Sequence, residues 1–521
     1  MKENKITCHS VWQEYQKDVS FKNSLDLFEK TKQHHNFFLG RQWEGLNAPD
    51  LEKPVLNFVK RVVNYLISVL MVNNIGINLK GSDRDEMLLR VQKEIEWVNE
   101  NTNFTAKLRR IIKNTAIDGD GVLYTRYNPE TRGVESEIVH NTNIVFGDRT
   151  NPEIEKQPYI ILVKHISAEV FRSMYPNVEE NTYGGYGVED EDVTVLIRFY
   201  KKNGTVHFVQ TTQNNMLTKE TDTKQKLYPV AFMNWEEVRN CCHGIGAVET
   251  IVPNQIAVNK LWAMALLYQK NNAFPKVFID KTKLDKWNSS PGAVMGVIGN
   301  PNDAVATSFR PQDMASQLMS IVEKTIAYTK DFMGANDAAL GNVSPTNTSA
   351  IIALQKTAVA PLDLQRQAMY RFVEDYARIV CDIIKAHYGV RRELTDEGET
   401  VYVDYRSFDS NARLTVDIGQ SEYWSETAQI QTLDNLFTKG IIDDALIYLE
   451  NIPANTLPNK NKIIEDIRRK RFEAEEQQSA EIAAFADRLI ADKNAAMGEY
   501  AEDVALADYM NFKEVAGVET L

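Results

Sequence analysis

The chain has 521 residues, of which 43% are hydrophobic and 25% charged, the balance of a globular protein that buries a large core. This length predicts about three domain-sized units. The formal net charge is −13. An acidic chain gains little affinity for DNA phosphates from counterion release, so the charge argues against a tight DNA-binding protein such as a repressor or a polymerase.

Cysteine content and apolar runs indicate where the protein is made. The four cysteines are Cys8, Cys241, Cys242 and Cys381. Two of them are adjacent, and neighbours rarely reach disulfide geometry, so we expect synthesis in a reducing cytoplasm. The longest apolar stretch, 62–72, is interrupted by Asn64 and Tyr65 and is shorter than the ~20 residues that cross a bilayer. Residues 1–18 lack the apolar run of a secretion signal, so we expect a soluble protein with no membrane partner.

The first 115 residues predict helices. Pro54 suits the first turn of a helix whose apolar residues follow at helical spacing. A second helical stretch covers about 85–114. Its inward side chains are predicted to be Leu88, Val91, Ile95, Val98, Phe104, Leu108 and Ile111.

The pattern then changes to strands, expected at 122–127, 144–146 and 159–164. The strongest local prediction is a hairpin formed by 193–200 and 206–211. Between these strands lies Asn203-Gly204, a pair that tolerates the positive φ angles of a tight turn.

Helices return in the second half of the chain. The helix expected at 247–271 is apolar nearly all round between 261 and 268, and such a helix must be covered on every side. Neighbouring copies of the chain are one source of that cover. A further helix is expected at 312–333, and a loop rich in Gly, Ala, Asn and Ser follows at 334–348.

The helical pattern resumes over 349–388 with a kink expected at Pro361. Its second half carries an inward stripe of Met369, Val373, Tyr376, Val380, Ile383 and His387. Short strands are predicted at 400–405 and 414–418. The segment 421–521 is helical in pattern and acidic, with 10 Lys and Arg against 20 Asp and Glu.

We find no motif that predicts catalysis, a cofactor or a metal site. A phosphate-binding loop needs Gly-Lys-Ser/Thr, and the sequence contains no Gly-Lys pair, which excludes a packaging ATPase. Cys241-Cys242-His243 lacks the second ligand pair of a zinc site. Asp118-Gly119-Asp120-Gly121 begins like a calcium loop but has no closing Glu, so a turn that leads into a strand is the better interpretation.

Three other sequence features have structural explanations. His34-His35 is interpreted as a solvated pair, and Gly244-Ile245-Gly246 as a structural turn. In the basic run 468–471, acidic residues four positions away neutralise the charge on a helix. An enzyme with dispersed carboxylates remains a rival hypothesis. A metal-dependent nuclease would use Asp118, Asp120, Asp148 and Glu153.

The order of these elements resembles the phage portal (head–tail connector) family over roughly 11–417. The resemblance rests on Gly244-Ile245-Gly246-Ala247, on 251–255 with Asn259-Lys260, and on 273–277. Further similar segments are 337–341, Asn347-Thr348-Ser349-Ala350, Ala360-Pro361-Leu362, and the stretch 37–43, which resembles the family pattern Y-x-G-x-Q-W.

The resemblance implies a fold of the α+β class, predominantly helical, that assembles into a ring, usually of twelve subunits. The implied regions are an N-terminal wing (1–246), a first stem helix (247–272), a clip (273–311), a second stem helix (312–333), a tunnel loop (334–349), a kinked helix with wing strands (350–420) and an acidic helical crown (421–521).

The implied function is structural and non-enzymatic. The ring would occupy one capsid vertex of the virion, be assembled in the host cytoplasm, and serve as conduit for packaging and ejection of double-stranded DNA. It would dock the terminase large subunit, the major capsid and scaffold proteins and the head–tail adaptor. Residues expected to face the DNA tunnel are Asn336, Asn342, Ser344, Asn347, Thr348, Lys324 and Lys330. The alternative is another virion assembly protein or helical adaptor without a DNA tunnel.

Overall fold

The chain forms two compact units, Met1–Gln420 and Ser421–Leu521, each described by itself. The computed structural model describes residues 6–49, 51–71, 75–80, 86–178, 192–273, 276–284, 286–288, 290, 292–303, 305–309, 315–335, 360–394, 400–408, 413–418, 426–442, 445–452, 460, 463–464, 467–470, 484 and 488. Among the helices of this described part, none has the length and apolar content that spanning a bilayer requires.

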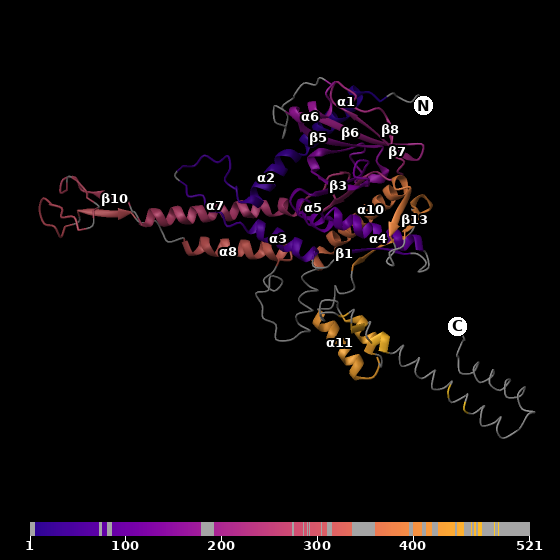
Figure 1. The fold of residues 1–521 in the computed structure, drawn as a ribbon. Helices are drawn as coiled ribbons and strands as arrows, with labels where there is room; N and C mark the ends of the chain where they lie inside the picture. The colour runs from indigo at the N-terminus through magenta and orange to yellow at the C-terminus, as the bar shows by residue number, and fades with distance from the viewer. Residues whose placement is uncertain are drawn as a thin grey trace, which may run out of the picture. The chain divides into compact units, whose positions relative to one another are not determined.

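Runs of helices and runs of antiparallel strands follow one another along the first unit, which confirms the α+β class (Figure 1). The helices are α1 (Cys8–Ser24), α2 (Leu27–Leu39), α3 (Phe58–Leu70), α4 (Glu86–Asn101), α5 (Phe104–Asp118), α6 (Ala168–Met174), α7 (Ala247–Ala273), α8 (Ala315–Phe332) and α10 (Asp363–His387). The strands are β1 (Ile75–Lys80), β2 (Asp120–Asn128), β3 (Gly133–Val139), β4 (Ile144–Phe146), β5 (Tyr159–Ser167), β6 (Asp192–Lys202), β7 (Thr205–Thr211), β8 (Thr221–Asp222), β9 (Val230–Asn234), β10 (Lys276–Ile279), β11 (Ala306–Phe309), β12 (Val390–Leu394), β13 (Thr400–Asp404) and β14 (Arg413–Ile418). The second unit contains α11 (Glu426–Thr438) and α12 (Ala445–Asn451).

The largest sheet is antiparallel, in the order β4-β5-β6-β7-β8. Its β6–β7 hairpin confirms the predicted turn, with φ of 53° at Asn203 and 87° at Gly204. Side chains alternate between the two faces of the sheet. One face packs on α1 through Val11, and the other enters a core that includes Phe146 and Phe199.

The main core lies between the helices α3, α4, α5, α7 and α10 and the sheet β3-β2-β9. The predicted stripe of α10 is buried from Met369 to Ile383, while His387 is half-buried and stacks on the Tyr127 ring at 4.7 Å. Inward residues predicted for 85–114, such as Val91, Ile95 and Leu108, are buried as expected.

The structure corrects three N-terminal predictions. The region is not all helical, because β1 pairs with β14. Pro54 precedes α3 instead of starting it, since Asn57 is the cap whose side chain accepts from the Lys60 N–H. The stretch 85–114 is two helices, α4 and α5, separated at Asn103, which adopts a left-handed φ of 51°. Strands β3, β8, β9, β11 and β12 and helix α6 are additions that the sequence did not predict.

Helix α7 extends away from the core, with β10 and its partner β11 at the far end and α8 running back beside it (Figure 1). The helices expected at 247–271 and 312–333 correspond to α7 and α8. We call α7, β10, β11 and α8 the α7–α8 projection. The loop at 336–348 and the helix expected at 349–359 lie outside the described residues.

Candidate assembly site on the α7–α8 projection

Residues 244–246 attach the start of α7 to the core, and Ile245 pairs with Glu236 in an antiparallel β-bridge. Gly119 has φ +96°, and a Cβ atom there would lie 2.4 Å from the Gly244 carbonyl oxygen. A Cβ atom on Gly246 would lie 2.7 Å from the Ile117 carbonyl oxygen. These contacts leave no room for a side chain on Gly119 or Gly246, so residues 244–246 have a structural role, although they form part of a β-bridge and not the turn that was expected.

The Asp120 side chain stabilises the same junction between the core and the start of α7. Its buried carboxylate accepts hydrogen bonds from Asn234 Nδ2 and the Gly244 N–H, both at 2.8 Å, and lies 2.7 Å from His243 Nδ1. Burial raises the pKa of the neighbouring Cys242 thiol, which keeps it protonated and inert. The carboxylate is therefore occupied by structural contacts.

The four carboxylates of the nuclease hypothesis do not converge. Asp118 pairs with His35, Asp148 accepts from the Thr150 N–H at 2.9 Å on an exposed turn, and Glu153 pairs with Lys156. Within the described residues no group of three or more His, Cys, Asp or Glu is placed to hold a metal ion. The geometry thus offers that hypothesis no support.

The prediction that His34 and His35 are a solvated pair is wrong. His34 is buried against α5, and His35 Nε2 lies 3.3 Å from the Asp118 carboxylate. Burial lowers the pKa of His34, aided by Lys30 and opposed by Glu249 and Asp118. The hydrogen bond to Asp118 raises the pKa of His35. The pKa values of the two adjacent histidines are therefore shifted in opposite directions from the usual value.

We expect the free energy of unfolding to fall as the pH drops below the ordinary histidine pKa of 6.5. Native His34 resists protonation while the unfolded residue accepts a proton, so acid favours the unfolded chain. Burial also lowers the pKa of His165 and of His387, so these residues too reduce the free energy of unfolding at acid pH. The raised pKa of His35 has the opposite effect on the free energy of unfolding.

The substitution His34→Gln should reduce the fall in the free energy of unfolding at acid pH. Chemical denaturation between about pH 7 and about pH 5 measures this fall. His9→Gln is the control, because His9 is exposed on α1. A pH dependence that is the same in His34→Gln and the wild type would refute the assignment.

Two buried amides anchor α7 to the core. Gln255 Nε2 donates to Asn259 Oδ1 at 2.9 Å and to the Leu56 carbonyl at 2.9 Å. Gln255 Oε1 accepts from the first N–H groups of α3, those of Phe58 and Val59, at 3.2 and 3.4 Å. A glutamine of α7 therefore supplies an N-terminal cap for another helix.

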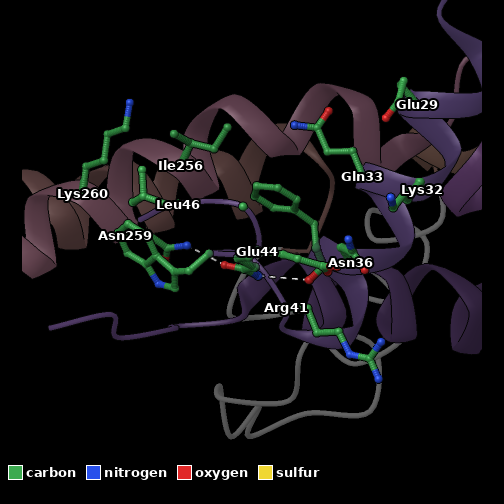
Figure 2. Close-up of a pocket in the computed structure, with 14 residues that line it drawn as sticks. Glu29, Lys32, Gln33, Asn36, Arg41, Glu44, Leu46, Ile256, Asn259 and Lys260 are labelled. Atoms are coloured by element: carbon green, nitrogen blue, oxygen red, sulfur yellow. Dashed lines mark hydrogen bonds between the residues drawn. The ribbon is translucent and has the colours of Figure 1, made fainter. Parts of the chain in front are cut away.

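The polar chain continues to the end of α2. Asn259 Nδ2 donates to Gln42 Oε1 at 2.6 Å, and Gln42 Nε2 donates to the Phe37 carbonyl at 3.0 Å (Figure 2). The family-like segments at 37–43 and 251–260, far apart in sequence, thus meet in one network. Gln255 and Asn259 belong to the segments that resemble the portal family, but the sequence did not identify their partners.

Helix α8 packs on α7 through a stripe that includes Val322, Ile326, Thr329 and Met333. Asn254 Nδ2 of α7 donates to Thr329 Oγ1 at 3.0 Å. A second apolar stripe lies about a quarter turn away around α8. Its members Ile321, Tyr328 and Phe332 are 50%, 59% and 86% exposed.

Helix α7 also has an uncovered face. Ala257, Lys260, Met264 and Leu267 recur at spacings of three and four residues and are exposed. Met264 is 56% and Leu267 37% exposed. The helix predicted to need cover on every side thus lacks it here within the described part of one chain.

The predicted tunnel residues divide into two groups. Lys324 is exposed and Lys330 half-buried on α8. The other five, Asn336, Asn342, Ser344, Asn347 and Thr348, lie outside the described residues. The exposed stripe of α8 was not predicted, although the spacing of residues 321, 325, 328 and 332 beside 322, 326, 329 and 333 marks two stripes on one helix.

Comparison with known proteins assigns the family. The model of the family described as phage P22-like portal protein matches residues 183–507, more than half of the chain, including α7, α8 and most of the second unit. A comparison with curated proteins found no match. The chain belongs to the phage P22-like portal protein family, a structural family of the phage capsid.

Proposed function

We propose that copies of this chain close laterally into a ring. The observation that supports it is the pair of uncovered apolar stripes on one projection: Ile321, Tyr328 and Phe332 on α8, and Ala257, Met264 and Leu267 on α7. Because the stripes are different surfaces, one copy's α8 packs on the next copy's α7, a head-to-tail contact. Repeated contacts of this kind generate a closed ring when the rotation between copies permits.

The regions of the chain take the roles implied by the sequence. Residues 1–246 form the wing, α7 and α8 the stem, and 273–311 the clip. Residues 334–349 form the tunnel loop, 350–420 the kinked helix with its wing strands, and 421–521 the crown. The division into compact units between Gln420 and Ser421 supports a separate crown.

The ring is the conduit for DNA during packaging and ejection. Each copy brings a net charge of −13, so a duplex meets mostly repulsion and slides without being held. Lys324 and Lys330 of α8, together with the polar residues of 336–348, are the candidates to face the tunnel. A separate motor drives the DNA, since the sequence has no phosphate-binding loop.

The far end of the projection is the docking tip. Phe278 of β10 and Trp287, Val294 and Ile298 of the segment that follows it are exposed. Clustered exposed apolar side chains mark protein interaction sites. The terminase large subunit and the head–tail adaptor bind here, while the capsid and scaffold proteins contact the wing.

The test is to place a charge in the α8 stripe. We expect Phe332→Asp to stay monomeric at concentrations where the wild type forms rings, because assembly would bury an unpaired carboxylate. Mass photometry and negative-stain images give the subunit number and shape. Met174→Asp, at an exposed apolar site on α6, is the control and should assemble normally. Unimpaired ring formation by Phe332→Asp would exclude this interface.

A further inference from the structure

A groove lies between α2, residues 41–46 and α7 (Figure 2). The cavity has a volume of about 610 Å³. Phe37, Trp43 and Ile256 supply its apolar lining, and Leu46 lines it from an exposed position. A groove of this size accommodates large side chains.

Fixed contacts hold the walls in place before anything binds. Trp43 Nε1 donates to the Pro54 carbonyl at 2.9 Å. Gln42 is held between Asn259 and the Phe37 carbonyl, which ties residues 41–46 to both α7 and α2. Preformed walls reduce the entropy lost on binding.

The charges around the groove are unusual for an acidic chain. Lys32 of α2, Arg41 of the loop and Lys260 of α7 each contribute a cation from a different wall. Glu29 and Glu44 also line the groove. Within the described residues, none of the three cations has an ion-pair or hydrogen-bond partner for its side chain. They are therefore available to an acidic occupant.

We propose that a second copy of the chain fills this groove with the C-terminal end of its α8, inserting Tyr328 and Phe332. This inference rests on the proposed ring and names the site that receives the α8 stripe. Lys260 belongs both to the groove and to the uncovered face of α7, so groove and proposed interface are continuous.

The end of α8 and the groove lie at the same height along the α7–α8 projection. Within one chain, Thr329 contacts Asn254 and Met333 contacts Thr250, so the end of α8 lies beside the first half of α7. Copies in a cyclic ring share the same height along the axis. With the projection along that axis, a neighbour's Tyr328 and Phe332 lie within about one helical turn of Ile256.

The charges of this helix end complement those of the groove. Asp331 is exposed between the two aromatic residues, and the last carbonyl groups of α8 carry the negative end of the helix dipole. Both face the cations Arg41 and Lys260.

Exchanging the charges of Lys260 and Asp331 tests the proposed contact between the groove and the neighbour's α8. We expect Lys260→Glu and Asp331→Lys each to raise the protein concentration needed for half-assembly by about tenfold. The double variant, which restores opposite charges, should return to the wild-type concentration. Sedimentation velocity measures the assembled fraction, and denaturation curves of each variant verify folding.

A cross-link gives the second readout. Leu46→Cys combined with Asp331→Cys should produce covalent multimers on oxidation of rings, visible in a denaturing gel, and none from monomers. Leu46→Cys with Met174→Cys is the control. If rings form but neither cross-linking nor charge rescue occurs, a different occupant fills the groove and the ring proposal stands. If the wild type never forms rings, both proposals fall.

Discussion

Replacing Lys22→Met is expected to lower the free energy of unfolding by about 3–5 kcal/mol, because it leaves a buried carboxylate without its partner. Lys22 Nζ lies 3.0 Å from Asp18 Oδ2, and both side chains are only 1% exposed. The same ammonium donates to the Thr142 carbonyl at 3.0 Å and to the Ile144 carbonyl at 2.5 Å. The substitution should therefore also loosen α1 from β4.

Urea unfolding followed by circular dichroism measures this loss. Lys156→Met is the matched control, since its pair with Glu153 is exposed and should be worth less than about 1 kcal/mol. The double variant Asp18→Leu/Lys22→Met should recover much of the loss, because both charges leave the core together. A stability of Lys22→Met equal to that of the control variant would show that the pair is not buried.

Replacing Gln255→Ala should cost about 2–4 kcal/mol, because it leaves several buried polar groups without hydrogen bonds. The first N–H groups of α3 lose their acceptor, and the Leu56 carbonyl and Asn259 lose a donor. The side chain is fully buried. Since Gln255 joins α7 to the core, the α7–α8 projection should lose protection against hydrogen exchange.

Gln269→Ala is the control on the same helix, at an exposed position, and should change stability by less than about 0.5 kcal/mol. Gln255→Glu separates the two roles of the amide. It keeps the acceptor for α3 but loses the donor to Leu56. Equal stabilities of Gln255→Ala and Gln269→Ala would contradict the anchoring role.

Local features of the fold were predictable from the sequence. The β6–β7 turn follows from the φ preferences of Asn203 and Gly204, and the α10 stripe follows from its spacing. The pairing of β1 with β14 was not predictable, because its partners lie near opposite ends of the first unit. Asn57, not Pro54, starts α3 because its side chain bonds the Lys60 N–H.

The candidate site was predictable only in part. The helical patterns of single segments predicted α7 and α8. The groove is formed by three segments that meet only after folding, so no pattern within one segment predicts it. The burial of His34 and Lys22 was missed because both lie in helices with polar sequences, where tertiary contacts decide which side is covered.

We propose that copies of this chain close into a ring around a channel. The most direct measurement is the mass and shape of the purified wild-type chain, by mass photometry and electron microscopy over a wide concentration range. We expect annular particles with a mass many times that of the 59.4 kDa chain. A folded monomer at every concentration, with no annuli even in the presence of capsid assembly partners, would contradict the account.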